Sequence, residues 1–131
     1  MAVFKDTEMM YEVLGGLFKN LLSDQGFASQ FKAANVTIKF IINDPEGIIN
    51  VKSDDVVCGE IPNFKPDVTM LLSGDTCHSF WLKKVNLPMA LAKRTIKAKG
   101  PVNKVLKVLP LLKPAYEMYP GICDQRGLPK G

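Results

Sequence analysis

The spacing of apolar residues changes twice along the chain, and these changes limit the possible folds more than any other feature. Between Met9 and Leu22 apolar residues recur every three or four positions, which is the pattern of one face of an amphipathic helix. From Val36 to Ser73 they form short runs separated by turn residues, a pattern typical of strands. After Gly74 the helical spacing returns. Helices before and after a block of strands predict an α+β fold built in layers.

Four strands are expected in the middle of the chain, at residues 36–42, 48–52, 56–61 and 67–73. Turn-forming residues lie between them, at 43–47 and at 53–55. Because parallel neighbours need a crossover of about a dozen residues or more, we expect these strands to form an antiparallel meander. A fifth strand is expected at 95–99, where lysines alternate with Ile96 and Ala98.

The predicted helices begin and end at recognisable residues. Asp6 or Thr7 can cap the first helix, which we expect to end near Gly26. Asp75 is placed to cap a helix that runs to about Lys84. Further helical segments are expected to start at Pro88 and Pro101, and two more prolines limit the last of them, Pro110 and Pro114. With 131 residues, we expect one domain over residues 1–121 and a polar tail over residues 122–131.

Charge is distributed unevenly. Residues 1–75 hold 6 basic and 11 acidic side chains, whereas residues 76–116 hold nine basic side chains and no acidic one. A surface of one sign attracts anionic partners. An apolar run of about 18 residues, which would suggest a membrane span, is not found in the sequence.

The cysteine and histidine content argues against a disulfide framework and against a metal centre. Three widely spaced cysteines are an odd number, and a single histidine without a Cys-x-x-Cys pair does not match a structural zinc site. We therefore expect free thiols, a cytoplasmic location and no metal or other cofactor.

Two stretches of the chain resemble the sterol carrier protein type 2 family. The first is Asp67-Val68-Thr69-Met70-Leu71-Leu72-Ser73-Gly74-Asp75, which is similar to the family's fourth strand and the start of the next helix. The second contains Phe80-Trp81-Leu82, then Asn86, Pro88 and Ala90, and then Ile96-Lys97-Ala98-Lys99-Gly100. The resemblance implies a mainly antiparallel five-stranded sheet, helices over one side of it, and an internal apolar cavity or tunnel between the two layers.

The same resemblance implies that the protein binds and transfers an apolar ligand without catalysis. Such a ligand would be a fatty acid, a fatty acyl-CoA, a sterol or a similar lipid. The candidate lining residues share an apolar side chain on a predicted inner face; they are Phe18, Leu22, Phe40, Ile42, Met70, Leu72, Phe80, Ile96, Val105, Leu109 and Leu112. The alternative is that these side chains fill an ordinary close-packed core.

The basic stretch also has two interpretations. Lys83, Lys84, Lys93 and Arg94 are candidates for contact with an anionic head group or an anionic membrane surface. The alternative is an ordinary solvated face. Nucleic acid is not expected as a partner, because too few aromatic residues lie among the lysines to form a stacking platform.

Two other functions remain open at this point. The same fold can serve as an interaction or scaffold subunit that presents its groove to a partner protein. A cysteine-based enzyme would use Cys77 and His78, but adjacent residues on a helix point about 100° apart, which is unsuitable for a nucleophile and its base. We expect His78 to be a surface residue of the helix.

Overall fold

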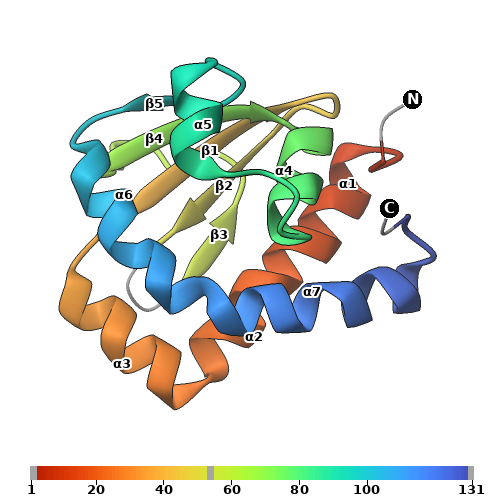
Figure 1. The fold of residues 1–131 in the computed structure, drawn as a ribbon, viewed down its shortest axis with the longest axis horizontal. Helices are drawn as coiled ribbons and strands as arrows, with labels where there is room; N and C mark the ends of the chain where they lie inside the picture. The colour runs from red at the N-terminus through yellow and green to blue at the C-terminus, as the bar shows by residue number, and fades with distance from the viewer. Residues whose placement is uncertain (1–2, 53–54, 130–131) are drawn as a thin grey trace.

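The central feature of the computed structural model is a five-stranded sheet with the order β3-β2-β1-β4-β5 (Figure 1). The structure describes residues 3–52 and 55–129, so part of the turn expected at 53–55 lies outside the described residues. The strand bounds are β1 Ile38–Asn43, β2 Gly47–Val51, β3 Val56–Cys58, β4 Val68–Ser73 and β5 Lys97–Lys99. The α+β class and the five-stranded sheet are thus confirmed.

The pairing of β1 with β4 corrects the expected meander. These two strands are parallel, with Phe40 opposite Met70, whereas β1–β2, β2–β3 and β4–β5 are antiparallel. The prediction was wrong here because it considered only strands that follow one another in the sequence. The β1–β2–β3 hairpins and the loop after them together form the crossover that a parallel partner requires. The sheet as a whole remains mainly antiparallel.

A polar contact fixes the start of the parallel pair. The backbone N–H of Thr37 donates a hydrogen bond to Asp67 Oδ2 at 2.9 Å, and the Asp67 N–H donates to Thr37 Oγ1 at 2.9 Å. The backbone N–H of Thr37 is the main reason that the pKa of the Asp67 carboxyl lies below its usual value. These reciprocal bonds set the register of β4 against β1 from their first residues.

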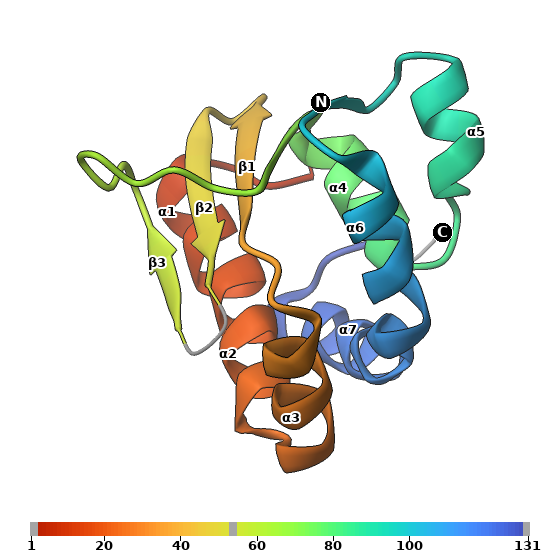
Figure 2. The ribbon, with the colours of Figure 1, turned by 90° about the vertical axis from the view of Figure 1, so that its left-hand side faces the viewer.

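Helices cover one face of the sheet. The first helical region consists of α1 (Thr7–Met10), the π-helical segment η1 (Tyr11–Gly15) and α2 (Gly16–Ser23), and α3 (Gln25–Ala34) follows. After β4 come α4 (Gly74–Trp81) and α5 (Leu87–Ala92), and after β5 come α6 (Val102–Val108), the 3-10 turn η2 (Leu109–Leu112) and α7 (Lys113–Arg126). Figure 2 shows β1 to β3 to one side and α4, α6 and α7 to the other. Within the described residues, no helix has the length and apolar character needed to cross a membrane.

The helix ends agree in part with the sequence analysis. Asp6 caps α1, as expected, with its Oδ1 accepting from the N–H of Met9 at 2.8 Å. For α4 the expectation was wrong, because Ser73 and not Asp75 is the cap. Asp75 instead accepts a hydrogen bond from the N–H of Val3 at 2.7 Å, which ties the N-terminal segment to α4.

Two helical segments differ from the expectation. The sequence analysis placed no helix after Gly26, yet α3 extends from Gln25 to Ala34, capped by Asp24. The segment after residue 121, expected as a polar tail, continues as α7 to Arg126, and its Cys123 is fully buried. Pro114 permits this helix because it lies in the first turn, where its missing N–H has no partner in any case.

Candidate functional site

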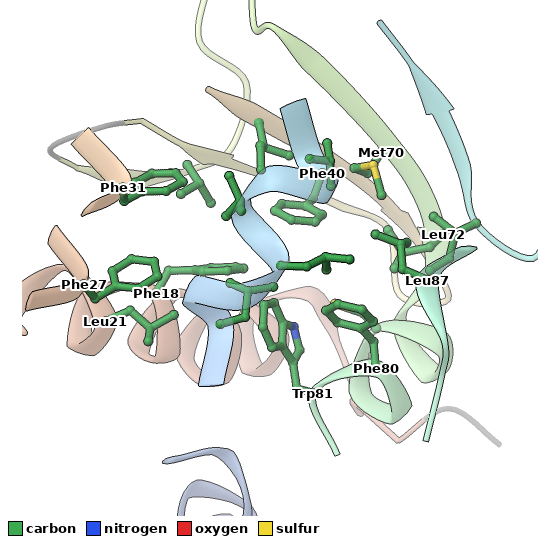
Figure 3. Close-up of a pocket in the computed structure, with 18 of the residues that line it drawn as sticks. Phe18, Leu21, Phe27, Phe31, Phe40, Met70, Leu72, Phe80, Trp81 and Leu87 are labelled. Atoms are coloured by element: carbon green, nitrogen blue, oxygen red, sulfur yellow. The ribbon is translucent and has the colours of Figure 1, made fainter. Parts of the chain in front are cut away.

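An apolar pocket lies between the inner face of the sheet and the helices (Figure 3). Figure 3 shows Phe27 and Phe31 at one end, Phe80 and Leu87 at the other, and Phe18, Phe40 and Trp81 between them. The volume of the pocket is about 60 Å³. Its lining residues come from α2, α3, four strands or their flanks, α4, α5, α6 and η2; they are Phe18, Leu21, Leu22, Phe27, Phe31, Ile38, Phe40, Val51, Met70, Leu72, Cys77, Phe80, Trp81, Leu87, Ile96, Val105, Val108, Leu109 and Leu112.

Strand alternation explains why the sheet contributes these side chains. Ile38 and Phe40 on β1 point to the same face as their neighbours Val68 and Met70 on β4, because paired residues in a register share a face. The residues between them, such as Lys39 and Leu71, point to the opposite face. A period of two along each strand therefore produces one continuous apolar wall.

The structure brings ten of the eleven predicted lining residues into this pocket and leaves one outside. The exception is Ile42, which is buried at 3% exposure but lines a separate hollow with Gly47 and Tyr11. This hollow lies where β1 turns into β2, and the side chains of Met10 and Tyr11 approach Gly47 there. Ile42 therefore continues the apolar face of β1 beyond the pocket.

Several lining residues escaped the sequence analysis. Phe27 and Phe31 come from α3, and their rings stack with centroids 5.4 Å apart. The signal for them was present, because Asp24 is a good N-cap and two phenylalanines four residues apart lie on one helical face. Trp81 was part of the family-like pattern, and Leu87 lies between two of its residues, but neither was expected to line the pocket.

Aromatic side chains form the middle of the pocket. The ring of Phe18 stacks on that of Phe40 with centroids 5.5 Å apart and meets the Trp81 ring edge-on at 5.4 Å. Phe80 lies edge-on to Trp81 at 4.9 Å. Such contacts hold α2, β1 and α4 together across the pocket, and each is worth about 0.5–1.5 kcal/mol beyond its buried area.

Cys77 lines the pocket but lacks the character of a nucleophile. It is 2% exposed, and burial raises the pKa of its thiol to about 12. Near neutral pH the thiol is therefore protonated, and the reactive thiolate is scarce. Cys58 is half-buried, and burial also raises the pKa of its thiol.

His78 is buried, which corrects the expectation of a surface residue. Its exposure is 4%, its Nδ1 lies 2.7 Å from the hydroxyl of Tyr119, and its Nε2 lies 2.7 Å from the carbonyl oxygen of Pro129. A carbonyl only accepts, so Nε2 carries the hydrogen, and the Tyr119 hydroxyl donates to Nδ1 in the neutral ring. Helical periodicity missed this because α7, which covers His78, was not expected. His78 thus joins α4 to α7 and to the C-terminal segment, away from Cys77.

The four basic candidates lie in the connections on either side of α5. Lys83, Lys84, Lys93 and Arg94 are all exposed, and none of them forms an ion pair within residues 3–52 and 55–129. Lys83 Nζ lies 5.5 Å from the centre of the Tyr116 ring, a cation–π distance. On α5 itself, Leu87 lines the pocket while Met89 is 54% exposed.

The described part of the chain contains no group of three or more His, Cys, Asp or Glu side chains arranged to hold a metal ion. It also contains no pairing of Cys77 with a base, because both nitrogens of His78 are engaged elsewhere. The arrangement offers an apolar surface between sheet and helices.

Comparisons with known proteins agree with this geometry. The structure is similar to sterol carrier protein 2 from Yarrowia lipolytica in its apo form, with 21% identity, a TM-score of 0.65, and coverage of 88% of this chain and 95% of that one. It is also similar to the sterol carrier protein domain 2 of Helicoverpa armigera, with 21% identity, a TM-score of 0.61 and coverage of 88% of both chains.

A third similar structure is a larger enzyme. The sec-alkylsulfatase Pisa1 from Pseudomonas sp. matches with 22% identity and a TM-score of 0.53, over 64% of this chain but only 14% of the enzyme. No match was found among curated protein sequences. The model of the SCP-2 sterol transfer family matches residues 17–113. The chain therefore belongs to the SCP-2 sterol transfer family.

Proposed function

We propose that this protein binds a lipid in the pocket between sheet and helices and transfers it without changing it chemically. Membership of the SCP-2 sterol transfer family supports a general role in lipid binding or transfer. The observation that carries the proposal for this chain is the pocket itself, whose lining is apolar along its whole length from Phe31 to Leu87. Apolar enclosures with few polar groups are typical of sites for hydrophobic ligands.

The hydrophobic effect supplies enough free energy for the pocket to bind a lipid. Burying a chain of about 14–16 carbons contributes on the order of 10 kcal/mol, at about 0.8 kcal/mol per methylene. The loss of ligand freedom costs several kcal/mol, which leaves affinities that are micromolar or tighter. Binding therefore requires no catalytic group.

The pocket must widen to hold such a guest. Its volume of about 60 Å³ is below the range of about 300–1,000 Å³ that is usual for ligand sites. Leu109 and Leu112 belong to η2, a single turn between α6 and α7, and both are half-buried. We infer that this short connection moves outward when a ligand enters, because it has fewer hydrogen-bonded turns to disrupt than the helices beside it.

The proposal includes contact of Lys83, Lys84, Lys93 and Arg94 with an anionic head group or membrane surface. Their exposure and their lack of acidic partners in the described residues support it. Their position at both ends of α5, beside the pocket residue Leu87, supports it as well. We also propose a cytoplasmic location, which is favoured by the finding that none of the three described cysteines forms a disulfide.

We propose that the chain has no catalytic step of its own. The raised pKa of the Cys77 thiol and the engagement of both His78 nitrogens support this. A role as a scaffold subunit remains the alternative. A measurement of lipid binding distinguishes a lipid carrier from a scaffold subunit.

Ligand binding is tested with a pocket-filling variant. Purified protein is titrated with a fluorescent fatty-acid analogue and examined by native mass spectrometry for a co-purified lipid. Leu109→Trp places bulk in the pocket, and Leu106→Trp is the matched control, because Leu106 on the adjacent helix α6 is 40% exposed. We expect the first variant to reduce affinity at least about tenfold and the second to leave it unchanged, since several methylenes would lose their contacts. A wild-type protein that binds no lipid, with a partner protein captured by the groove instead, would favour the scaffold function.

A further inference from the structure

The polar atoms of the pocket lining are few, and one of them lacks a partner. The indole Nε1–H of Trp81 is buried and has no hydrogen-bond acceptor among the described residues. The whole side chain is 2% exposed and lines the pocket. Figure 3 shows the nitrogen, in blue, among the apolar side chains of the pocket. A buried donor without an acceptor costs about 1–3 kcal/mol, so such a group calls for an explanation.

The neighbours of Trp81 do not supply a strong acceptor. The thiol of Cys77 is close enough for the indole N–H to act on it and lower its pKa, but sulfur is a weak acceptor. The aromatic contacts of Trp81 are with the rings of Phe18, Phe80 and Tyr116, at centroid distances of 5.4, 4.9 and 6.1 Å. An aromatic face offers only a weak interaction with an N–H. The indole N–H thus lacks a strong acceptor, and it becomes accessible to a guest only when the pocket widens.

We propose that the preferred guest carries a neutral carbonyl oxygen, as in a long-chain ketone or ester, and that Trp81 Nε1–H donates a hydrogen bond to it. This inference rests on the proposed function and specifies its ligand class. A carbonyl accepts without donating, so it matches a pocket that offers one donor and no strong acceptor. A hydroxyl would leave its own O–H unpaired, and an ionised carboxylate would be desolvated with a single donor for its oxygens. A pure hydrocarbon would leave the indole N–H as it is.

The position of Trp81 also orients the guest. Trp81 lies between the two ends of the pocket, next to Phe80 on the α4 side, whereas Phe27 and Phe31 close the far end (Figure 3). The carbonyl therefore lies towards α4 and α5, and the apolar chain extends towards α3. In this orientation the longest part of the guest lies against phenylalanine and aliphatic side chains.

The chain offers a direct probe, because Trp81 is its single tryptophan. Protein labelled with ¹⁵N gives one indole cross-peak, which is followed by NMR while hexadecan-2-one or hexadecane is added from cyclodextrin. We expect the indole proton to move downfield with the ketone and to lack this downfield shift with the alkane. We also expect Trp81→Phe to bind the ketone about 2- to 10-fold more weakly, the net worth of one hydrogen bond, without a comparable loss for hexadecane.

Phe18→Leu is the matched control, since it removes an aromatic ring that contacts Trp81 but no polar atom. It should weaken binding of both probes by similar factors. Binding of both probes with an unmoved indole proton, or equal losses in Trp81→Phe, would overturn this inference and leave the proposed function intact. Binding of neither probe would overturn this inference, whereas the titration with the fatty-acid analogue decides the proposed function separately. Because the NMR measurement uses the wild-type protein, it decides the question even where a variant folds poorly.

Discussion

His78 links three parts of the chain through one imidazole ring, and its environment makes it sensitive to pH. Burial is the main cause that lowers the pKa of His78 from its usual value, and the nearby charge of Lys84 acts in the same direction. The Pro129 carbonyl and the charge of Asp75 oppose this effect but do not reverse it. The neutral ring is therefore the form that the folded state prefers.

From this pKa we predict a loss of stability on mild acidification. A histidine whose pKa is lowered in the folded state binds protons more readily when the protein is unfolded. The contribution of His78 to the free energy of unfolding is therefore complete above about pH 6.5 and declines as the pH falls below that value. Thermal unfolding between pH 7.5 and 5 measures the effect. His78→Gln retains a donor for Pro129 and an acceptor for Tyr119 but does not titrate, so its unfolding temperature should change less over this range. Equal pH slopes in the two proteins would contradict the prediction.

Cys77 provides a second prediction for a single residue. Its buried thiol, with a pKa raised to about 12, should resist alkylation by iodoacetamide at pH 8 in the folded protein, while the half-buried Cys58 reacts first. In denaturant all three cysteines should react, and mass spectrometry of the peptides distinguishes them. Rapid alkylation of Cys77 in the native protein, together with loss of an activity in Cys77→Ser, would instead support a cysteine-based enzyme.

At the scale of elements, local patterns in the sequence predicted which segments are helices or strands better than they predicted which strands pair with each other. Phe40 and Met70 were correctly assigned to inner faces because the period of two is a property of each strand alone. Their parallel pairing depends on how the β1–β2–β3 hairpins fold back, which no local pattern contains. In the same way, α7 is compatible with Pro114 only because of where that proline falls in the first turn.

Gly100, which ends β5, allows a prediction about how this strand joins α6. Its φ is +106°, and a Cβ there would collide with the backbone oxygen of Asp67. Gly100→Ala should therefore destabilise the protein by about 1–3 kcal/mol, through backbone strain and displacement of β4. Gly121→Ala is the matched control, because a Cβ there meets no atom within 4 Å and Gly121 lies inside α7. It should stabilise by up to about 1 kcal/mol. Urea unfolding midpoints that shift alike in the two variants would contradict this account.

At the scale of the whole molecule, the sequence predicted the wall of the pocket better than its ends or its volume. Ten lining residues followed from periodicity and resemblance, since apolar side chains that face inward must meet in the core. The ends depend on tertiary packing, which brings in Phe27 and Phe31 at one side and ends the pocket before Ile42 at the other. The volume depends on how closely these side chains pack, and a single sequence does not contain that information.

The uneven distribution of charge should affect how the whole molecule binds to an anionic membrane, and a matched pair of variants tests this effect. The double variant Lys84→Glu/Lys93→Glu reverses two exposed charges beside α5, and leaves Lys83, which contacts Tyr116, in place. The control Lys52→Glu/Lys65→Glu alters lysines outside the acid-free stretch, and Lys65 lies on the loop between β3 and β4. In Figure 2, β3 and α5 lie on opposite sides of the molecule. Each double variant lowers the formal net charge from +4 to 0, so only the position of the charges differs.

We predict that the first double variant binds phosphatidylserine-containing vesicles at least about tenfold more weakly than the wild type, since a lysine near an anionic membrane is worth about 1 kcal/mol. Transfer of a fluorescent fatty-acid analogue to these vesicles should slow with it, whereas transfer to pure phosphatidylcholine vesicles should not. The control variant should behave like the wild type, and about 1 M salt should remove the difference because it shortens the screening length to about 3 Å. Equal losses in both double variants would show that net charge alone governs the approach to the membrane, and the surface around α5 would then have no special part in it.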